Sequence, residues 1–148
     1  MPSYATTTEL TDRFPDQDTV THLTNSNTGL PDTNVLTDVL DAAEAVLESF
    51  LAMRYEVPVD VSSDTRVAAV MRSMTLDVAQ HDLIATKEFV PDAKVALHDR
   101  AIAWAKSIAR GEAVLPGSDP VTSTTSRATR LKSSFDEREF TRENQAGM

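Results

Sequence analysis

Residues 36–61 read LTDVLDAAEAVLESFLAMRYEVPVDV, and this stretch decides the fold. Its first part repeats apolar residues with the 3.6-residue period of an amphipathic helix: Leu36, Val39, Leu40, Ala43, Val46, Leu47, Phe50 and Leu51. Its last part contains Pro58, which disfavours helical geometry at Val57, so we expect the helix to stop there. Alternating valines (Val57, Val59, Val61) then predict a short extended link. The stretch therefore predicts a corner between two helices.

The corner also contains a large cation and an aromatic ring. Arg54 can contact the terminal carbonyls of its own helix or pair with Asp77, a carboxylate expected to be largely buried in the next helix. Tyr55 can pack its ring and keep its hydroxyl in water. We interpret Arg54, Tyr55, Pro58 and Asp77 as a structural corner in preference to a direct contact with DNA or a partner protein.

Outward from this corner the chain predicts further helices. A short one is expected over about residues 7–14, and residues 15–31 form a polar loop with at most one helical turn near Val20 and Leu23. The next long helix, capped by Ser62, Ser63 or Asp64, runs to about residue 86 and is apolar nearly all round, as a central helix is. A last helix begins near Pro91 and ends at Gly111, a left-handed C-cap. Trp104 lies on its apolar face and is expected in the core.

The predicted fold class is mainly α: a small bundle of about four helices with a long polar loop and an extended C-terminal arm. Residues 1–116 would form the helical domain and residues 117–148 the arm, which is rich in Ser and Thr and has no amphipathic period. Alone, such a segment should be disordered. Its charged and large apolar residues favour docking on another surface: Arg127, Arg130, Leu131, Phe135, Arg138, Phe140 and Arg142.

Composition limits the function. The 148 residues suit one domain, and the lack of cysteine excludes disulfides, thiolate catalysis and Cys-ligated metals. A formal net charge of −9 disfavours a grip on nucleic acid but allows DNA to slide past without adhering. No apolar run is long enough for a membrane span, and the N-terminus lacks the features of a signal peptide, so we expect synthesis in the cytoplasm and no membrane partner.

Four acidic residues recur along the first long helix at spacings of three, three and four: Asp38, Asp41, Glu44 and Glu48. This spacing predicts one stripe directed away from the apolar face. The stripe is either an ordinary solvated face or a functional surface.

The sequence contains little that suggests catalysis. The histidines His22, His81 and His98 have no metal-binding spacing, and no nucleophile elbow or phosphate-binding glycine loop is present. We therefore predict no catalytic residues, no metal site and no cofactor.

Five short motifs in order resemble the phage head–tail connector (adaptor) proteins of Mu-like and lambdoid prophages. The motifs are YATTTEL with DRF (residues 4–14), LAMRYEVPV (51–59), LDVAQHDL (76–83), AIAWAKSIARGEAVLP (101–116) and REFTR (138–142). Together they cover nearly the whole chain.

The resemblance implies a structural virion protein without catalysis. It would form a ring, of twelve subunits by the family pattern, beneath the portal in the virion neck. That ring would join the portal protein to the tail or a tail-completion protein and extend the channel through which genomic DNA leaves. The acidic stripe would face that channel, and the C-terminal arm would reach the portal or a neighbour.

Two other functions stay open at this point. One is a non-enzymatic helical protein-binding module whose tail folds on binding. The other is an enzyme with a carboxylate site on the first long helix, which would need carboxylates in a cleft with separated pKa values.

Overall fold

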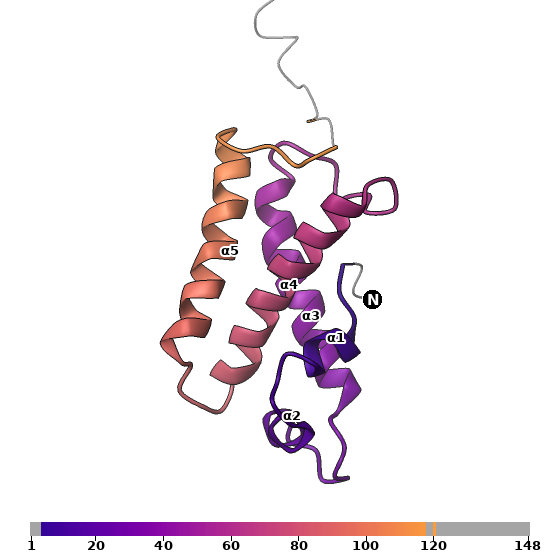
Figure 1. Cartoon of the computed structure of the whole chain (residues 1–148), viewed down its shortest axis with the longest axis vertical. Coiled ribbons are helices and arrows are strands. Elements are labelled where there is room, and N and C mark those ends of the chain that lie inside the picture. Colours follow the sequence, from indigo (N-terminus) through magenta and orange to yellow (C-terminus); the bar gives the residue numbers. More distant parts are fainter. Residues whose placement is uncertain (1–3, 118–119, 121–148) are drawn as a thin grey trace, which may run out of the picture.

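The computed structural model describes residues 4–117 and 120, and in this part of the chain it contains five helices and no strand (Figure 1). Three long helices make the bundle: α3 (Thr33–Leu51), α4 (Thr65–Ala85) and α5 (Asp92–Arg110). Two short helices, α1 (Thr7–Thr11) and α2 (Gln17–Leu23), precede them. Helix α4 packs on α3, α5 and α1, and it has more buried residues than α3 or α5, as expected of a central helix. The predicted mainly-α class is confirmed.

The helix termini follow local capping chemistry. Thr6 and Glu9 form a reciprocal capping box at the start of α1, and Asp32 and Asp64 accept backbone N–H groups at the starts of α3 and α4. Gly111 ends α5 in the left-handed region, at φ 80°. The caps at Asp64 and Gly111 are where the sequence predicted them.

Three element boundaries differ from prediction. Helix α1 ends at Thr11, not near Phe14, because the following backbone N–H groups bond three residues back in turns. Helix α2 is longer than the single predicted turn because Asp16 caps it by accepting the N–H of Thr19. Helix α3 ends at Leu51, well before Pro58, since the turn from Ala52 to Tyr55 already closes it.

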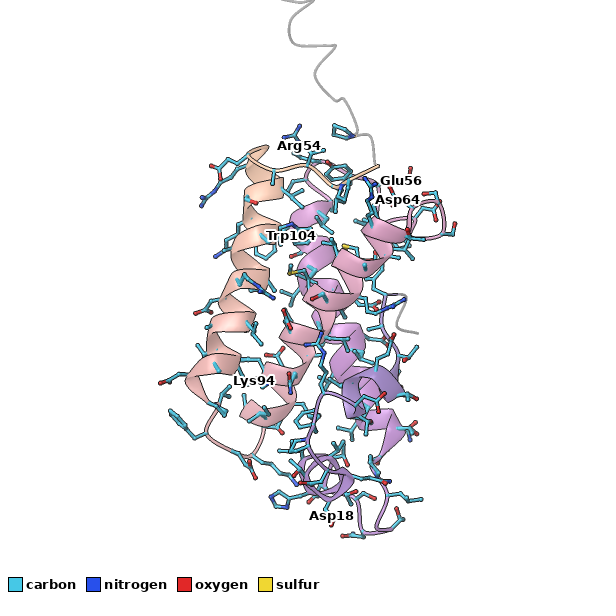
Figure 2. All side chains as sticks on the ribbon, viewed as in Figure 1. Asp18, Arg54, Glu56, Asp64, Lys94 and Trp104 are labelled. Atoms are coloured by element: carbon cyan, nitrogen blue, oxygen red, sulfur yellow. The ribbon has the colours of Figure 1, made fainter. Side chains whose placement is uncertain are left out.

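The core has two adjoining parts. The larger lies between the three long helices and the two short ones, with fully buried Leu10, Leu40 and Leu83 among its members. The smaller surrounds the corner after α3, where Tyr55, Met71 and Leu115 meet. Trp104 on α5 (Figure 2) was predicted in the core; it is partly buried and packs against both parts.

Candidate docking surface and acidic face

The four acidic residues of α3 do not form one solvated stripe. Asp38 is exposed, Asp41 and Glu48 are half-buried, and Glu44 is only 6% exposed. The prediction that all four point away from the packed face is therefore wrong for Glu44 and Glu48. The N-terminal segment covers this side of α3, which the helical period alone could not reveal.

Tyr4 donates hydrogen bonds to both of these carboxylates. Its backbone N–H donates to Glu44 at 2.7 Å, and its hydroxyl donates to Glu48 at 2.6 Å. The same hydroxyl accepts the backbone N–H of Val59 at 2.7 Å. Burial, together with the hydrogen bond to Glu48, raises the pKa of the Tyr4 hydroxyl well above its ordinary value, so the group remains a donor. Tyr4 thus joins the N-terminus, α3 and the corner.

Asp77 is buried at the centre of α4, but its cationic partners are not the predicted one. Arg13 contacts one carboxylate oxygen at 3.0 Å and Arg100 contacts the other at 3.0 Å. The expected pairing with Arg54 is wrong. The Asp77 side chain is only 2% exposed, so its carboxylate has lost its hydration. The two ion pairs compensate for that loss.

Gln80, one turn below, extends this polar centre. Its side-chain amide donates to the backbone carbonyl of Arg13 at 3.0 Å and accepts from Lys94 at 3.1 Å. The network therefore connects the end of the α1 segment to both α4 and α5. Sequence reasoning missed Arg13 and Arg100 because their distance along the chain gives no periodic signal.

The corner is structural, with different contacts from those expected. The guanidinium of Arg54 lies against Gly111, in the space that a side chain at that glycine would occupy. Tyr55 is 5% exposed, and its hydroxyl accepts the N–H of Leu115 at 3.1 Å, so the expectation of a wet hydroxyl is wrong. The Val57–Pro58 peptide bond is cis. Arg54 and Tyr55 therefore hold the chain after α5 against the end of α3.

An exposed apolar patch lies where the C-terminal halves of α3 and α5 meet. Met53 is 69% exposed beside Phe50, and the two line a hollow of about 290 Å³ with Lys106, Ala109 and Arg110. The Lys106 ammonium lies 5.9 Å from the centre of the Phe50 ring, within cation–π range. We call these five residues the α3–α5 patch. It combines an apolar centre with a cationic rim.

Comparison with known proteins identifies the chain. The family model described as Bacteriophage Mu, Gp36 matches residues 4–133. The chain belongs to the bacteriophage Mu Gp36 family. A search of curated proteins finds no match. The chain is thus a phage protein, and its family indicates a structural or morphogenesis role.

In this Gp36-family chain, the motifs noted in the sequence are also the positions that make the long-range contacts. YATTTEL supplies Tyr4, DRF supplies Arg13, and LAMRYEVPV supplies Tyr55. LDVAQHDL supplies Asp77, and the last helical motif supplies the Gly111 cap. Each of these four motifs therefore has a physical role in fixing the bundle, whereas the fifth, REFTR, lies outside the described residues.

The remaining predicted residues lie outside the described part of this Gp36-family chain. They are the arm residues Arg127, Arg130, Leu131, Phe135, Arg138, Phe140 and Arg142. Among the described residues, no helix is both long and apolar enough to cross a membrane.

Proposed function

We propose that this Gp36-family protein is a head–tail connector. It assembles as a ring, of twelve subunits, beneath the portal in the virion neck. The ring joins the portal protein to the tail or a tail-completion protein and extends the channel through which genomic DNA leaves. In this proposal the protein is structural and has no catalytic role. The support is its membership of a phage family together with a surface suited to assembly.

The α3–α5 patch is the observation that carries this proposal. An exposed methionine and a half-buried phenylalanine beside two cations are typical of a protein-binding surface, where an apolar centre has a charged rim. A ring requires a heterologous interface, in which one surface of each copy receives a different surface of the next. The patch is a suitable receiving surface.

The C-terminal arm of a neighbouring copy is the occupant that fits the patch. Residues 135–140 read FDEREF and place aromatic rings beside three carboxylates. The rings match Phe50 and Met53, and the carboxylates match Lys106 and Arg110. Phe135 follows Pro120 by fifteen positions. Extended, this stretch spans about 50 Å, more than the length of α3, which allows the arm to reach another subunit.

The acidic character of the chain suits a conduit for DNA. A net charge of −9 repels phosphates, so the wall of the channel would not retain the passing genome. Of the four acidic residues predicted to form a stripe on α3, Asp38 is the best placed to face the channel, because it is exposed. Glu44 and Glu48 instead bind Tyr4, so we assign them no role in the channel.

A mass measurement on the purified protein, alone and mixed with the portal protein of the same phage, tests the connector function. A ring bound to the portal supports the proposal. Monomer in both samples overturns it and favours a free-standing protein-binding module. Monomer in the first sample alone is compatible with a ring that forms only on the portal.

Disulfide trapping tests the occupant of the patch. Because the chain has no cysteine, Met53→Cys and Phe140→Cys introduce the only thiols. When the two variants are mixed with portal and oxidised, we expect covalent dimers that contain one copy of each. A double variant that gives only internally linked monomer, or no link, overturns docking on a neighbour while the ring measurement still decides the connector function.

Substitutions that place a charge in the patch, or reverse one, identify which contacts hold the arm. Met53→Asp should prevent ring assembly on the portal, whereas Leu30→Asp, at a similarly exposed apolar position in the loop before α3, should not. Lys106→Glu should weaken assembly, and Glu139→Lys in the same chain should restore it. Equal assembly by all variants would exclude the patch.

A further inference from the structure

Two histidines that are far apart in sequence meet across the α4–α5 interface. His81 on α4 and His98 on α5 stack with their ring centroids 4.1 Å apart and an interplanar angle of 26°. Asp82 Oδ1 lies 2.9 Å from His81 Nδ1, and Asp99 Oδ1 lies 3.2 Å from His98 Nδ1. The local sequence spacing gave no sign of this meeting.

We propose that His81, His98 and Asp82 bind a divalent transition-metal ion such as Zn²⁺. Each residue offers one ligand atom, and these atoms all lie within 4.8 Å of one another. Two imidazoles and a carboxylate form a ligand set that suits Zn²⁺ and its neighbours in the first transition row and is poorly matched to Ca²⁺ or Mg²⁺. Water would complete a tetrahedral site.

The change of geometry on binding is small and falls on side chains. A tetrahedral ion with bonds of about 2.1 Å separates its ligand atoms by about 3.4 Å. Atoms already within 4.8 Å reach this spacing by side-chain rotation, without movement of either helix. The near-parallel rings must turn so that their lone pairs converge on the ion, so binding ends the stacking.

The surroundings favour a cation. Asp99 lies beside His98 Nδ1, where its carboxylate would orient the ring and leave Nε2 for the ion. Lys94 and Arg100, the two cations of α5 that flank His98 in the sequence, are engaged with Gln80 and with Asp77. Asp82 and Asp99 contact the two rings with their carboxylates.

The site is also accessible to ions from solution. The side chains of His81 and His98 are 22% and 25% exposed, and that of Asp82 is 43% exposed. An ion can enter from solvent while most of each ring stays packed. Bound there, the ion would connect α4 to α5 and stabilise the folded chain by mass action.

Titration of the full chain with Zn²⁺ at pH 7.5, followed by calorimetry, tests the site. We expect one site in the wild type, at least a tenfold loss of affinity for His81→Ala and for His98→Ala, and about a tenfold loss for Asp99→Asn. His22→Ala is the matched control, since this third histidine lies on α2 and is 66% exposed. A wild type that does not bind Zn²⁺ overturns the proposal, as does an equal loss in the His22 variant.

Two further measurements do not depend on the alanine variants folding normally. In the NMR spectrum of the wild type, Zn²⁺ should shift the ring signals of His81 and His98 together and leave those of His22 in place. Zn²⁺ should also raise the melting temperature of the wild type, and less so at pH 5.5, because only neutral imidazole binds the ion. Shifts at His22 alone, or an unchanged melting temperature at pH 7.5, would exclude a site between the helices.

Discussion

The hydroxyl of Tyr4 donates a hydrogen bond to Glu48 at a separation of 44 positions in the chain, and so fixes the N-terminal segment on α3. Since the same oxygen accepts the N–H of Val59, one atom joins three segments. The contact turns an acidic residue of an apparent surface stripe into an anchor for the fold.

Tyr4→Phe should therefore destabilise the bundle. The variant removes both hydrogen bonds of the hydroxyl and leaves a buried backbone N–H without its acceptor, so the free energy of unfolding should fall by about 1–3 kcal/mol. Urea denaturation measures this loss. Tyr55→Phe provides the comparison: it removes one neutral bond, from Leu115, and should cost less. A Tyr4 variant as stable as the wild type would refute the anchoring role.

Asp77 should depend on Arg13 and Arg100 and be independent of Arg54. Asp77→Asn removes the buried carboxylate that both cations contact, but Arg13 and Arg100 are 33% and 59% exposed and can be solvated by water, so we expect a loss of about 1–3 kcal/mol. Double-mutant cycles with Arg13→Met and Arg100→Met should give coupling free energies clearly different from zero.

The control for this network is Arg54→Met combined with Asp77→Asn. Arg54 lies against Gly111, so the two effects should add. Strong coupling between Arg54 and Asp77, with none to Arg13 or Arg100, would reverse the assignment of partners.

These residues also show how far sequence reasoning extends. The start of α4 at Asp64 and the end of α5 at Gly111 were predictable, because caps depend on a few neighbouring residues. The period of α3 likewise predicted its buried leucines. The partners of Asp77 were not predictable, because Arg13 and Arg100 meet it only after the helices pack.

The candidate surfaces could not be predicted from the sequence for the same reason: they form only when the helices pack. Glu44 has the spacing of a solvated residue, and only the path of the N-terminal segment shows that it is buried. His81 and His98 belong to different helices, so their contact depends on the register of α4 against α5. Met53 lies within the corner that the sequence emphasised, yet its 69% exposure follows from the early end of α3.

The capping box of α1 predicts a dependence of stability on pH. The backbone hydrogen bond from Thr6 lowers the pKa of Glu9 below its ordinary value, with help from the Thr6 hydroxyl and from Arg72. A lowered folded-state pKa contributes stability above the ordinary glutamate value, and this contribution is lost as the pH falls through the lowered pKa.

Glu9→Gln should remove that part of the acid dependence. Urea unfolding of the wild type and the variant at neutral pH and near pH 3 should give a smaller difference in free energy for the variant. Glu112→Gln, at an exposed position after α5, is the control and should retain the wild-type profile. Parallel profiles for wild type and Glu9→Gln would show that the box contributes nothing to acid sensitivity.

Gly111 and Gly29 allow two effects of a glycine substitution to be separated. Both have φ near +80°, at 80° and 76°, so alanine at either position carries a backbone cost of about 1–2 kcal/mol. A side-chain carbon at Gly29 meets nothing, whereas at Gly111 it would occupy the position of the Arg54 guanidinium. Gly111→Ala should therefore lower the free energy of unfolding more than Gly29→Ala does.

Adding Arg54→Ala to Gly111→Ala should remove the excess loss of stability over Gly29→Ala, because the side chain that the new methyl group displaces is then absent. Thermal denaturation of these three variants, and of Arg54→Ala alone as the reference for the double variant, measures the backbone cost and the displacement cost. An excess that persists without Arg54 would mean that the guanidinium does not occupy this corner.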